Sequence, residues 1–362
     1  MTDQLGKVQK RDGKVWIEGI PKLSWGTNRE CTFAGAIEAR LTIAAHPMKY
    51  SDIMGYSALA FRFRWMDRTT NGGVWGVASP VGEFPEEIDM YQKLTGAQIT
   101  YDNTGLTQDL EDPKIVRFRE QIIASIDAGN PVIAHLVEGN VGVIYGYENE
   151  GEGLIGRDYM RDYSEEEVII PIDEAGPFIM FLNQQDPLPS LSPSQILKET
   201  LRLAVSNWKR NRGPKNDDRF YYGDAAYADW IQGLRDLEQY ELAEKQLAEM
   251  FFANWWGFNC LCDARRAVVL FLQDHKSLLG ERSQECLEKA LQLYQQEVSV
   301  LEAVYESKDV FIGPWSDLFQ NWAENWTKLM RTREEEILTK TRQIESEAIR
   351  EIEQALDLAD EE

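Results

Sequence analysis

The chain has 362 residues, enough for two domains that each bury a hydrophobic core. Hydrophobic residues make up 43% of it, so its composition is that of a globular rather than a disordered protein. Its 61 acidic and 38 basic residues give a formal net charge of −23, which argues against nucleic acids and anionic membranes as partners, because both are polyanions.

The sequence contains no apolar run of 18 residues and no basic leader followed by an apolar stretch, so we expect a soluble, cytoplasmic protein. Four cysteines in a chain of this length do not make a disulfide framework, and Cys260 and Cys262 have no histidine cluster nearby. We therefore expect no metal and no other cofactor. Any histidine chemistry must use one of three residues, His46, His135 or His275.

Residues 24–38 begin as a loop of glycine and small polar residues and continue with helical periodicity. The helix is expected to end near Ala45, because Pro47 disfavours helical geometry in the residue before it. Cys31 then falls in the first helical turn, where unpaired amide N–H groups and the positive end of the helix dipole favour a thiolate and an oxyanion. The alternative is that Cys31 is a small buried hydrophobic residue, as most free cysteines are.

The following elements come as helices first and strands later. A short helix is expected near 51–57, a strand at 58–66 and a turn at 71–73, and the further predicted helices are 85–95 and 113–128. Strands at 131–137, 141–147 and 154–158 follow, with a tight hairpin turn between the first two. This order predicts an α+β domain with an antiparallel sheet.

The second half of the chain is predicted to be helical. We expect an N-terminal arm at 1–19, the α+β domain at 20–185, a proline-rich linker at 186–193 and an all-α domain at 194–362. The last helix repeats apolar residues at alternating spacings of four and three, and its other, charged face is expected to be solvated. It packs onto its own domain or forms a coiled-coil homodimer. The predicted helices of this half are 194–210, 223–237, 239–256, 259–277, 282–307 and 316–358.

Residues 24–180 resemble the papain-like cysteine peptidase superfamily, and within it most closely the N-terminal domain of butirosin biosynthesis protein H and the double-glycine leader peptidases. The resemblance implies a cysteine on the first core helix that faces a histidine on the sheet, oriented by Asp or Asn. In the butirosin relative such a domain implies acyl transfer from a carrier-protein thioester to an amine, and in the leader peptidases it implies peptide cleavage. The matching segments are 30–36 (ECTFAGA), 54–61 (MGYSALAF), 129–135 (GNPVIAH), 143–147 (VIYGY) and 157–159 (RDY).

The sequence departs from the family at the histidine that starts the second hairpin strand, where it has Asn140. Asparagine does not take a proton from a thiol near neutral pH, so another base is needed. If the hairpin turns at 138–139, His135 pairs with Gly142, shares a sheet face with Asn140 and leans toward Cys31. A slip of one residue turns His135 to the other face. The second candidate, His46, is about four helical turns from Cys31 at 1.5 Å per residue.

The other expected site residues have structural alternatives. Asp158 aligns with the orienting Asp of the family, and otherwise it is a surface carboxylate paired with Arg157 or Arg161. Asn28 or the Cys31 N–H is a candidate oxyanion donor, although Asn28 also suits a helix cap.

The densest aromatic stretch of the helical half is 220–230. The resemblance makes this stretch part of a substrate-side wall, in which we expect Tyr222 and Tyr227 together with Trp25. The alternative is that these rings are inter-helix core.

These observations predict a thiol-dependent acyl-transfer enzyme, either an acyltransferase or an amidase or peptidase. Cys31 is its nucleophile, His135 the substitute base, Asp158 or Asn140 the orienting group and Asn28 the oxyanion donor. The expected substrate is a small molecule, a peptide or a carrier-protein thioester, bound in the cleft between the domains. The alternative is a catalytically degenerate papain-like protein that binds a small molecule or peptide in that cleft, as Asn140 indicates.

Overall fold

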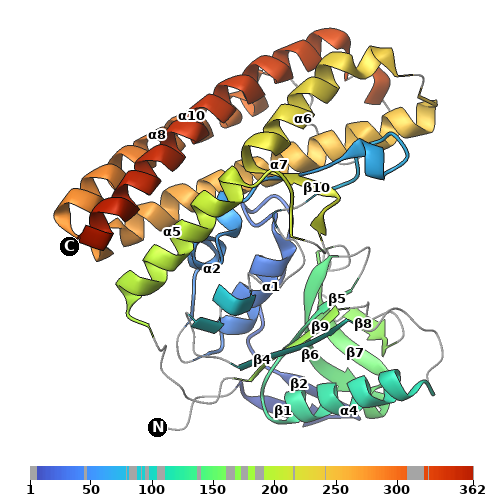
Figure 1. Cartoon of the computed structure of the whole chain (residues 1–362). Helices are drawn as coiled ribbons and strands as arrows, with labels where there is room; N and C mark the ends of the chain where they lie inside the picture. The colour runs from blue at the N-terminus through green and yellow to red at the C-terminus, as the bar shows by residue number, and fades with distance from the viewer. Residues whose placement is uncertain are drawn as a thin grey trace. The chain divides into compact units, whose positions relative to one another are not determined.

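The structure is a computed structural model. Contacts within it divide the chain into two compact units. We call Met1–Ile53 with Tyr91–Ser190 the sheet unit, and Met54–Met90 with Leu191–Glu362 the helical unit (Figure 1). An antiparallel sheet with helices, followed by long helices, confirms the predicted α+β class. The described residues are 6–44, 47–78, 80, 88–90, 92–93, 98–103, 111–136, 140–159, 168–172, 178–183, 191–214, 217–240, 242–307, 322–324 and 326–361.

The sheet unit is built on strand β6, which pairs along both edges. β5 and β2 follow one another along one edge of β6, and β7 takes the other edge. The order runs β1-β2-β6-β5-β9-β4, with β7 beside β6 and β8 beside β7, and every described pairing is antiparallel. The strands are β1 (Val8–Arg11), β2 (Lys14–Ile17), β4 (Gln98–Asn103), β5 (Val132–His135), β6 (Val141–Glu148), β7 (Gly153–Arg157), β8 (Val168–Pro171) and β9 (Phe178–Asn183).

Helix α4 (Pro113–Asp127), which was predicted at 113–128, covers one face of this sheet. Asp112 caps its first turn by accepting from the Lys114 N–H at 2.8 Å, and Gly129 follows its end with a φ of +79°. Its apolar residues at three- and four-residue spacing pack on alternate residues of the strands. This core contains Ile115, Phe118, Ile122 and Ile126 of α4 with Val132, Ala134, Leu136, Ile144 and Leu154 of the sheet.

Helix α1 (Thr32–Leu41) covers the opposite face. Figure 1 shows α1 and α4 on opposite sides of the sheet. The buried residues of α1, among them Phe33 and Ile37, are not part of the core that α4 forms with the sheet. Side chains of β5 and β6 that point away from α4 therefore point toward α1.

The helical unit contains the five long helices α5 (Pro193–Lys209), α6 (Gly223–Asp236), α7 (Glu244–His275), α8 (Glu281–Ser307) and α10 (Lys328–Glu361). This confirms the helical prediction for the second half of the chain. The predicted break between 256 and 259 is wrong, because α7 continues through Gly257. A Cβ at Gly257 would lie 2.6 Å from the Trp65 ring, so the glycine there serves close packing rather than helix ending.

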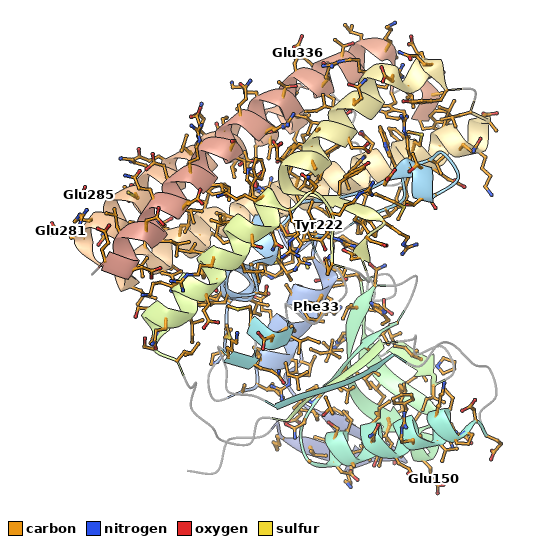
Figure 2. All side chains as sticks on the ribbon, viewed as in Figure 1. Phe33, Glu150, Tyr222, Glu281, Glu285 and Glu336 are labelled. Carbon is orange, nitrogen blue, oxygen red and sulfur yellow. The ribbon has the colours of Figure 1, made fainter. Side chains whose placement is uncertain are left out.

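The last helix, α10, packs along α8 and also against α5 and α6 of its own unit. Its repeating apolar residues, such as Ala348 and Ile352, are buried in that packing, as expected for a helix that packs on its own domain. The coiled-coil homodimer stays a prediction. Acidic side chains such as Glu281, Glu285 and Glu336 are exposed on α8 and α10 (Figure 2), in agreement with the strongly negative charge of the chain.

Residues 54–90, which the sequence analysis assigned to the first domain, group with the helical unit. Strand β3 (Arg64–Met66) pairs with β10 (Phe220–Tyr222), and the Arg265 side chain of α7 donates to the Ala60 carbonyl at 2.6 Å. These pairings are long-range, so no local pattern in the sequence marks them. The unit boundary falls within the short helix α2 (Tyr50–Tyr56).

Gly55 of α2 offers a test of this packing. A Cβ at Gly55 would overlap three ring carbons of Phe271 on α7. The Phe271 ring is rigid and fully buried, so it cannot move aside for the added methyl group. We therefore expect Gly55→Ala to lower the free energy of unfolding by about 1–3 kcal/mol in urea titrations followed by circular dichroism. Gly76→Ala is the control, since its Cβ would meet the flexible thioether end of Met66. Equal losses in both variants would contradict the packing at Gly55.

Candidate active site

Cys31 occupies the N-terminal end of α1, as predicted. It is the N-cap residue, with an extended backbone (φ −81°, ψ 96°), and its carbonyl accepts from the Gly35 N–H at 3.0 Å. Its own N–H donates to the Tyr50 hydroxyl at 3.0 Å. The residue is only 2% exposed. The thiol is thus buried and lies at the positive end of a helix.

One hydrogen bond fixes this helix end on the hairpin. The Val141 N–H, at the first residue of β6, donates to the Thr32 hydroxyl at 3.2 Å. Val141 directly opposes His135 across the hairpin. Thr32, the residue after Cys31, is therefore hydrogen-bonded to Val141, the direct strand partner of His135.

The hairpin register differs from the expected one. His135 pairs with Val141 rather than Gly142, and the Leu136 N–H donates to the Asn140 carbonyl at 2.9 Å. The predicted pairing is wrong by one residue, and the expected turn at 138–139 lies outside the described residues. The reason is the core. The observed register sets Val132 opposite Ile144, and both pack on the α4 side, whereas the expected register would set Val132 opposite Tyr145, which is not part of that core.

This register separates the two candidate residues on the hairpin. By the alternation of strand side chains, His135 shares the α1 side of the sheet with Val141, whereas Asn140 lies on the α4 side with Leu136. The sequence analysis expected them on one face. His135 nevertheless lies on the side of α1, the helix that carries Cys31, because its neighbours Ala134 and Leu136 pack on the α4 side.

His135 is partly buried, and this burial lowers the pKa of its imidazole below the ordinary value. The ring is then neutral at neutral pH, the form that accepts a proton from a thiol. Of the other histidines, His275 belongs to the helical unit and its Nδ1 lies 3.2 Å from the Tyr56 hydroxyl. His46, the second candidate base, lies outside the described residues.

Asp158 follows β7 immediately and is fully buried, so the surface-carboxylate alternative is wrong. The next residue, Tyr159, packs so closely on Gly35 of α1 that a Cβ at Gly35 would overlap its hydroxyl. Its ring also lies 4.7 Å from that of Trp25, between ring centroids. The end of β7 and the loop before α1 therefore meet at the helix that carries Cys31.

Asn28 is exposed and has a left-handed backbone, with a φ of +59°. The helix-cap alternative is wrong, because α1 begins after Cys31 and the Cys31 residue is itself the N-cap. Trp25 is partly buried against Tyr159.

Tyr50 is a residue of this site that sequence reasoning missed. It accepts the Cys31 N–H from 19 residues away along the chain. Its own N–H donates to the Glu38 carboxylate at 3.0 Å, and Arg29 donates twice to the same carboxylate, at 2.5 and 3.1 Å. The Glu38 hydrogen bond raises the pKa of Arg29. Neither spacing nor composition signals a contact of this kind.

The two tyrosines expected to bind substrate lie within the helical unit (Figure 2 labels Tyr222). The Tyr222 hydroxyl donates to Asp217, and burial raises its pKa to about 12. The Tyr227 hydroxyl donates to Glu345 at 2.8 Å and lies 3.3 Å from a carboxyl oxygen of Glu297, and no part of its side chain is exposed. Both environments favour the core alternative of the sequence analysis.

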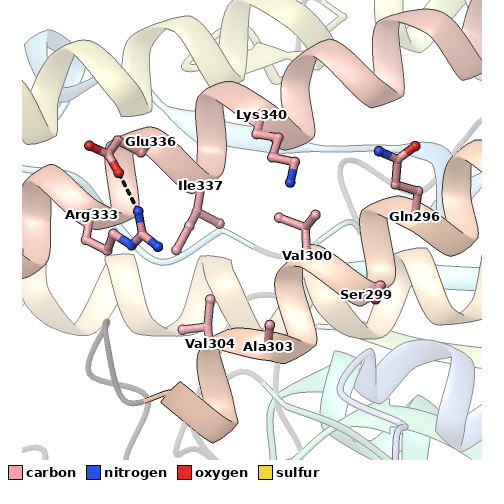
Figure 3. A pocket seen from close by; sticks show the side chains of 9 residues that line it. All are labelled: Gln296, Ser299, Val300, Ala303, Val304, Arg333, Glu336, Ile337 and Lys340. Atoms are coloured by element: carbon pink, nitrogen blue, oxygen red, sulfur yellow. Dashed lines mark hydrogen bonds and ion pairs between the residues drawn. The ribbon is translucent and has the colours of Figure 1, made fainter.

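A surface groove of about 710 Å³ runs between α8 and α10 (Figure 3). Its floor is apolar, and its rim carries Lys340 and the Arg333–Glu336 ion pair at 2.6 Å. The groove suits an apolar group, and it has neither a cysteine nor a histidine for thiol chemistry. Its lining residues are Gln296, Ser299, Val300, Ala303, Val304, Arg333, Glu336, Ile337 and Lys340.

Within the described part of the chain, no group of three or more His, Cys, Asp or Glu side chains is arranged to hold a metal ion. None of the described helices combines the length and the apolar character needed to cross a membrane. No protein-family model matches the chain, and no curated protein matches its sequence.

Proposed function

We propose that the chain is a thiol-dependent acyl-transfer enzyme with a papain-like sheet unit, in which Cys31 is the nucleophile and His135 the base. The observation that carries this proposal is the docking of the Cys31 end of α1 onto β6, through the Thr32–Val141 hydrogen bond. The residue opposite Val141 is His135, on the side of the sheet that faces α1. Nucleophile and base thus come from the helix start and the hairpin, the arrangement that the resemblance implies.

The proposed chemistry needs no further reagent. His135 takes the thiol proton, and the Cys31 sulfur forms a bond to the acyl carbon of a thioester or amide. The bond to the leaving thiolate or amine then breaks, and His135 returns the proton to that leaving group. Attack by an amine or by water on the acyl-enzyme completes transfer or hydrolysis.

Asp158 is the better candidate to orient His135. It is fully buried and directly follows the strand beside β6, whereas Asn140 is only partly buried. A buried carboxylate suits this role, because it fixes the tautomer and orientation of an imidazole and stabilises its cation. The substrate is an acyl thioester, including one on a carrier protein, a small-molecule amide or a peptide.

The pH dependence of thiol alkylation tests the nucleophile. We expect iodoacetamide to label Cys31 with a half-maximal rate below about pH 7, as for a thiol activated by a helix end and an imidazole. His135→Gln is expected to move that midpoint toward about pH 8.5, the value of an ordinary thiol. Mass spectrometry identifies the labelled residue. Cys262 is an internal control, because burial raises its pKa to about 12.

The second candidate is a papain-like protein that binds a small molecule or peptide without chemistry. The 2% exposure of Cys31 favours it, because a buried sulfur opposes the approach of a substrate. An alkylation curve centred near pH 8.5 in the unmodified protein, unchanged by His135→Gln, would support this candidate and end the enzyme proposal.

A further inference from the structure

Tyr50 is hydrogen-bonded to the residue on which an acyl intermediate would form. When a thiolate attacks a carbonyl, the carbonyl oxygen becomes an oxyanion, which is stabilised by donors at about 2.7–3.1 Å. For a cysteine at a helix start, its own backbone N–H is one natural donor. In this chain that N–H already donates to the Tyr50 hydroxyl, at 3.0 Å. The hydroxyl therefore lies one hydrogen bond from the reacting residue.

The position of Tyr50 is fixed from two sides. Its backbone N–H donates to the carboxylate of Glu38, a residue of α1, the helix that begins at Cys31. Arg29 donates two hydrogen bonds to the same carboxylate. The Arg29 guanidinium carbon lies 5.9 Å from the centre of the Tyr50 ring. Tyr50 is only 6% exposed. A donor held in this way does not have to reorganise when charge develops beside it, which is the condition for electrostatic stabilisation.

The hydrogen-bond directions make the hydroxyl a donor to a third group. Because the Tyr50 oxygen accepts from the Cys31 N–H, its own hydrogen must point elsewhere. A hydroxyl that accepts from an amide is also a stronger donor, since linked hydrogen bonds polarise one another. The helix end favours negative charge at the same place. Asn28, the donor expected from the sequence, is exposed instead.

We propose that the Tyr50 hydroxyl donates a hydrogen bond to the oxyanion that forms when an acyl group bonds to Cys31. This inference rests on the proposed thiol chemistry and adds a catalytic residue to it. As the sulfur–carbon bond forms, the carbonyl π electrons move to oxygen, and Tyr50 stabilises that charge without giving up its proton. Collapse restores the carbonyl and expels the leaving thiolate, which takes the proton held by His135.

The test is the variant Tyr50→Phe, assayed with an acyl thioester of N-acetylcysteamine. We expect the rate of thiol release to fall about 10²–10³-fold, the usual effect of removing one oxyanion donor. Alkylation of Cys31 by iodoacetamide is expected to change less than about twofold, because substitution at a saturated carbon forms no oxyanion. Tyr56→Phe is the matched control on the same helix, since the Tyr56 hydroxyl faces His275.

A second variant leaves the hydroxyl in place. Glu38→Gln weakens the double hydrogen bond with Arg29 and is expected to slow thiol release by less than Tyr50→Phe does. Unchanged alkylation in the same samples shows that the site is folded. Thiol release from Tyr50→Phe at the original rate, or faster, overturns the role of Tyr50 and leaves the thiol enzyme standing. Absence of any acylation of the unmodified protein, with Cys31 still alkylated, instead refutes the proposed function itself.

Discussion

Replacing Arg265 by methionine is expected to lower the free energy of unfolding of the helical unit by about 3–5 kcal/mol, the cost of breaking a buried ion pair by removing one partner. Arg265 is fully buried in α7, and its Nη2 donates to Glu345 of α10 at 2.5 Å. Its Nε lies 3.5 Å from Glu297 of α8, which is also fully buried. Without the guanidinium, two buried carboxylic groups face each other with no compensating charge.

The neighbouring residue provides the control. Arg266 pairs with Glu302 at 2.6 Å near the surface of the same helix, so Arg266→Met is expected to cost no more than about 1 kcal/mol. Urea unfolding followed by circular dichroism measures both variants. Adding Glu345→Gln to Arg265→Met is expected to recover part of the loss, because it removes one of the unpaired groups. Equal losses in Arg265→Met and Arg266→Met would contradict a buried network.

This network shows why part of the fold could not be predicted. The long helices were visible in the sequence because apolar periodicity is a local property, although α7 was predicted as two helices. The buried polar network joins four helices, α6, α7, α8 and α10. The local sequence of one helix does not predict which residue of another helix it will contact. The network consists of Tyr227, Arg265, Glu297 and Glu345. The same holds for residues 54–90, whose place in the helical unit depends on pairing with β10 about 150 residues later.

The candidate site divides in the same way. The position of Cys31 at a helix start follows from the loop and periodicity around it, and the structure agrees. The register of His135 does not follow, because it depends on which residues of β5 pack against α4. The contacts of Tyr50 with Cys31 and Glu38 are tertiary contacts, and no pattern in the sequence predicts them.

The sequence analysis was also wrong about part of α10. It expected the charged side chains of this helix to be solvated, but Glu334 and Glu345 are fully buried. Both belong to the buried four-and-three series of α10, four residues before Leu338 and four after Thr341. Glu334 and Glu345 could have been predicted as buried acids, because their spacing places them on the same helix face as the apolar repeat.

Glu334 is therefore expected to make the stability of the helical unit depend on pH. It accepts from the Asn254 side-chain amide at 2.8 and 3.1 Å, and burial raises its pKa to about 7. Between about pH 4.5 and 7 the folded protein keeps this proton while the unfolded chain loses it, so the free energy of unfolding falls as pH rises. The shift corresponds to a loss of about 3 kcal/mol from this group.

The variant Glu334→Gln removes this dependence, because glutamine resembles the protonated acid at every pH. We expect it to unfold at nearly the same urea concentration as the unmodified protein at about pH 4.5, and to be more stable by about 3 kcal/mol at about pH 8. Glu335→Gln is the control, because Glu335 is the next residue and pairs with Arg235 on the surface. Other buried acids such as Glu297 contribute equally to all three proteins, so the difference between their curves isolates Glu334. Parallel curves for the unmodified protein and Glu334→Gln would mean that this carboxyl group is ionised in the folded state at neutral pH.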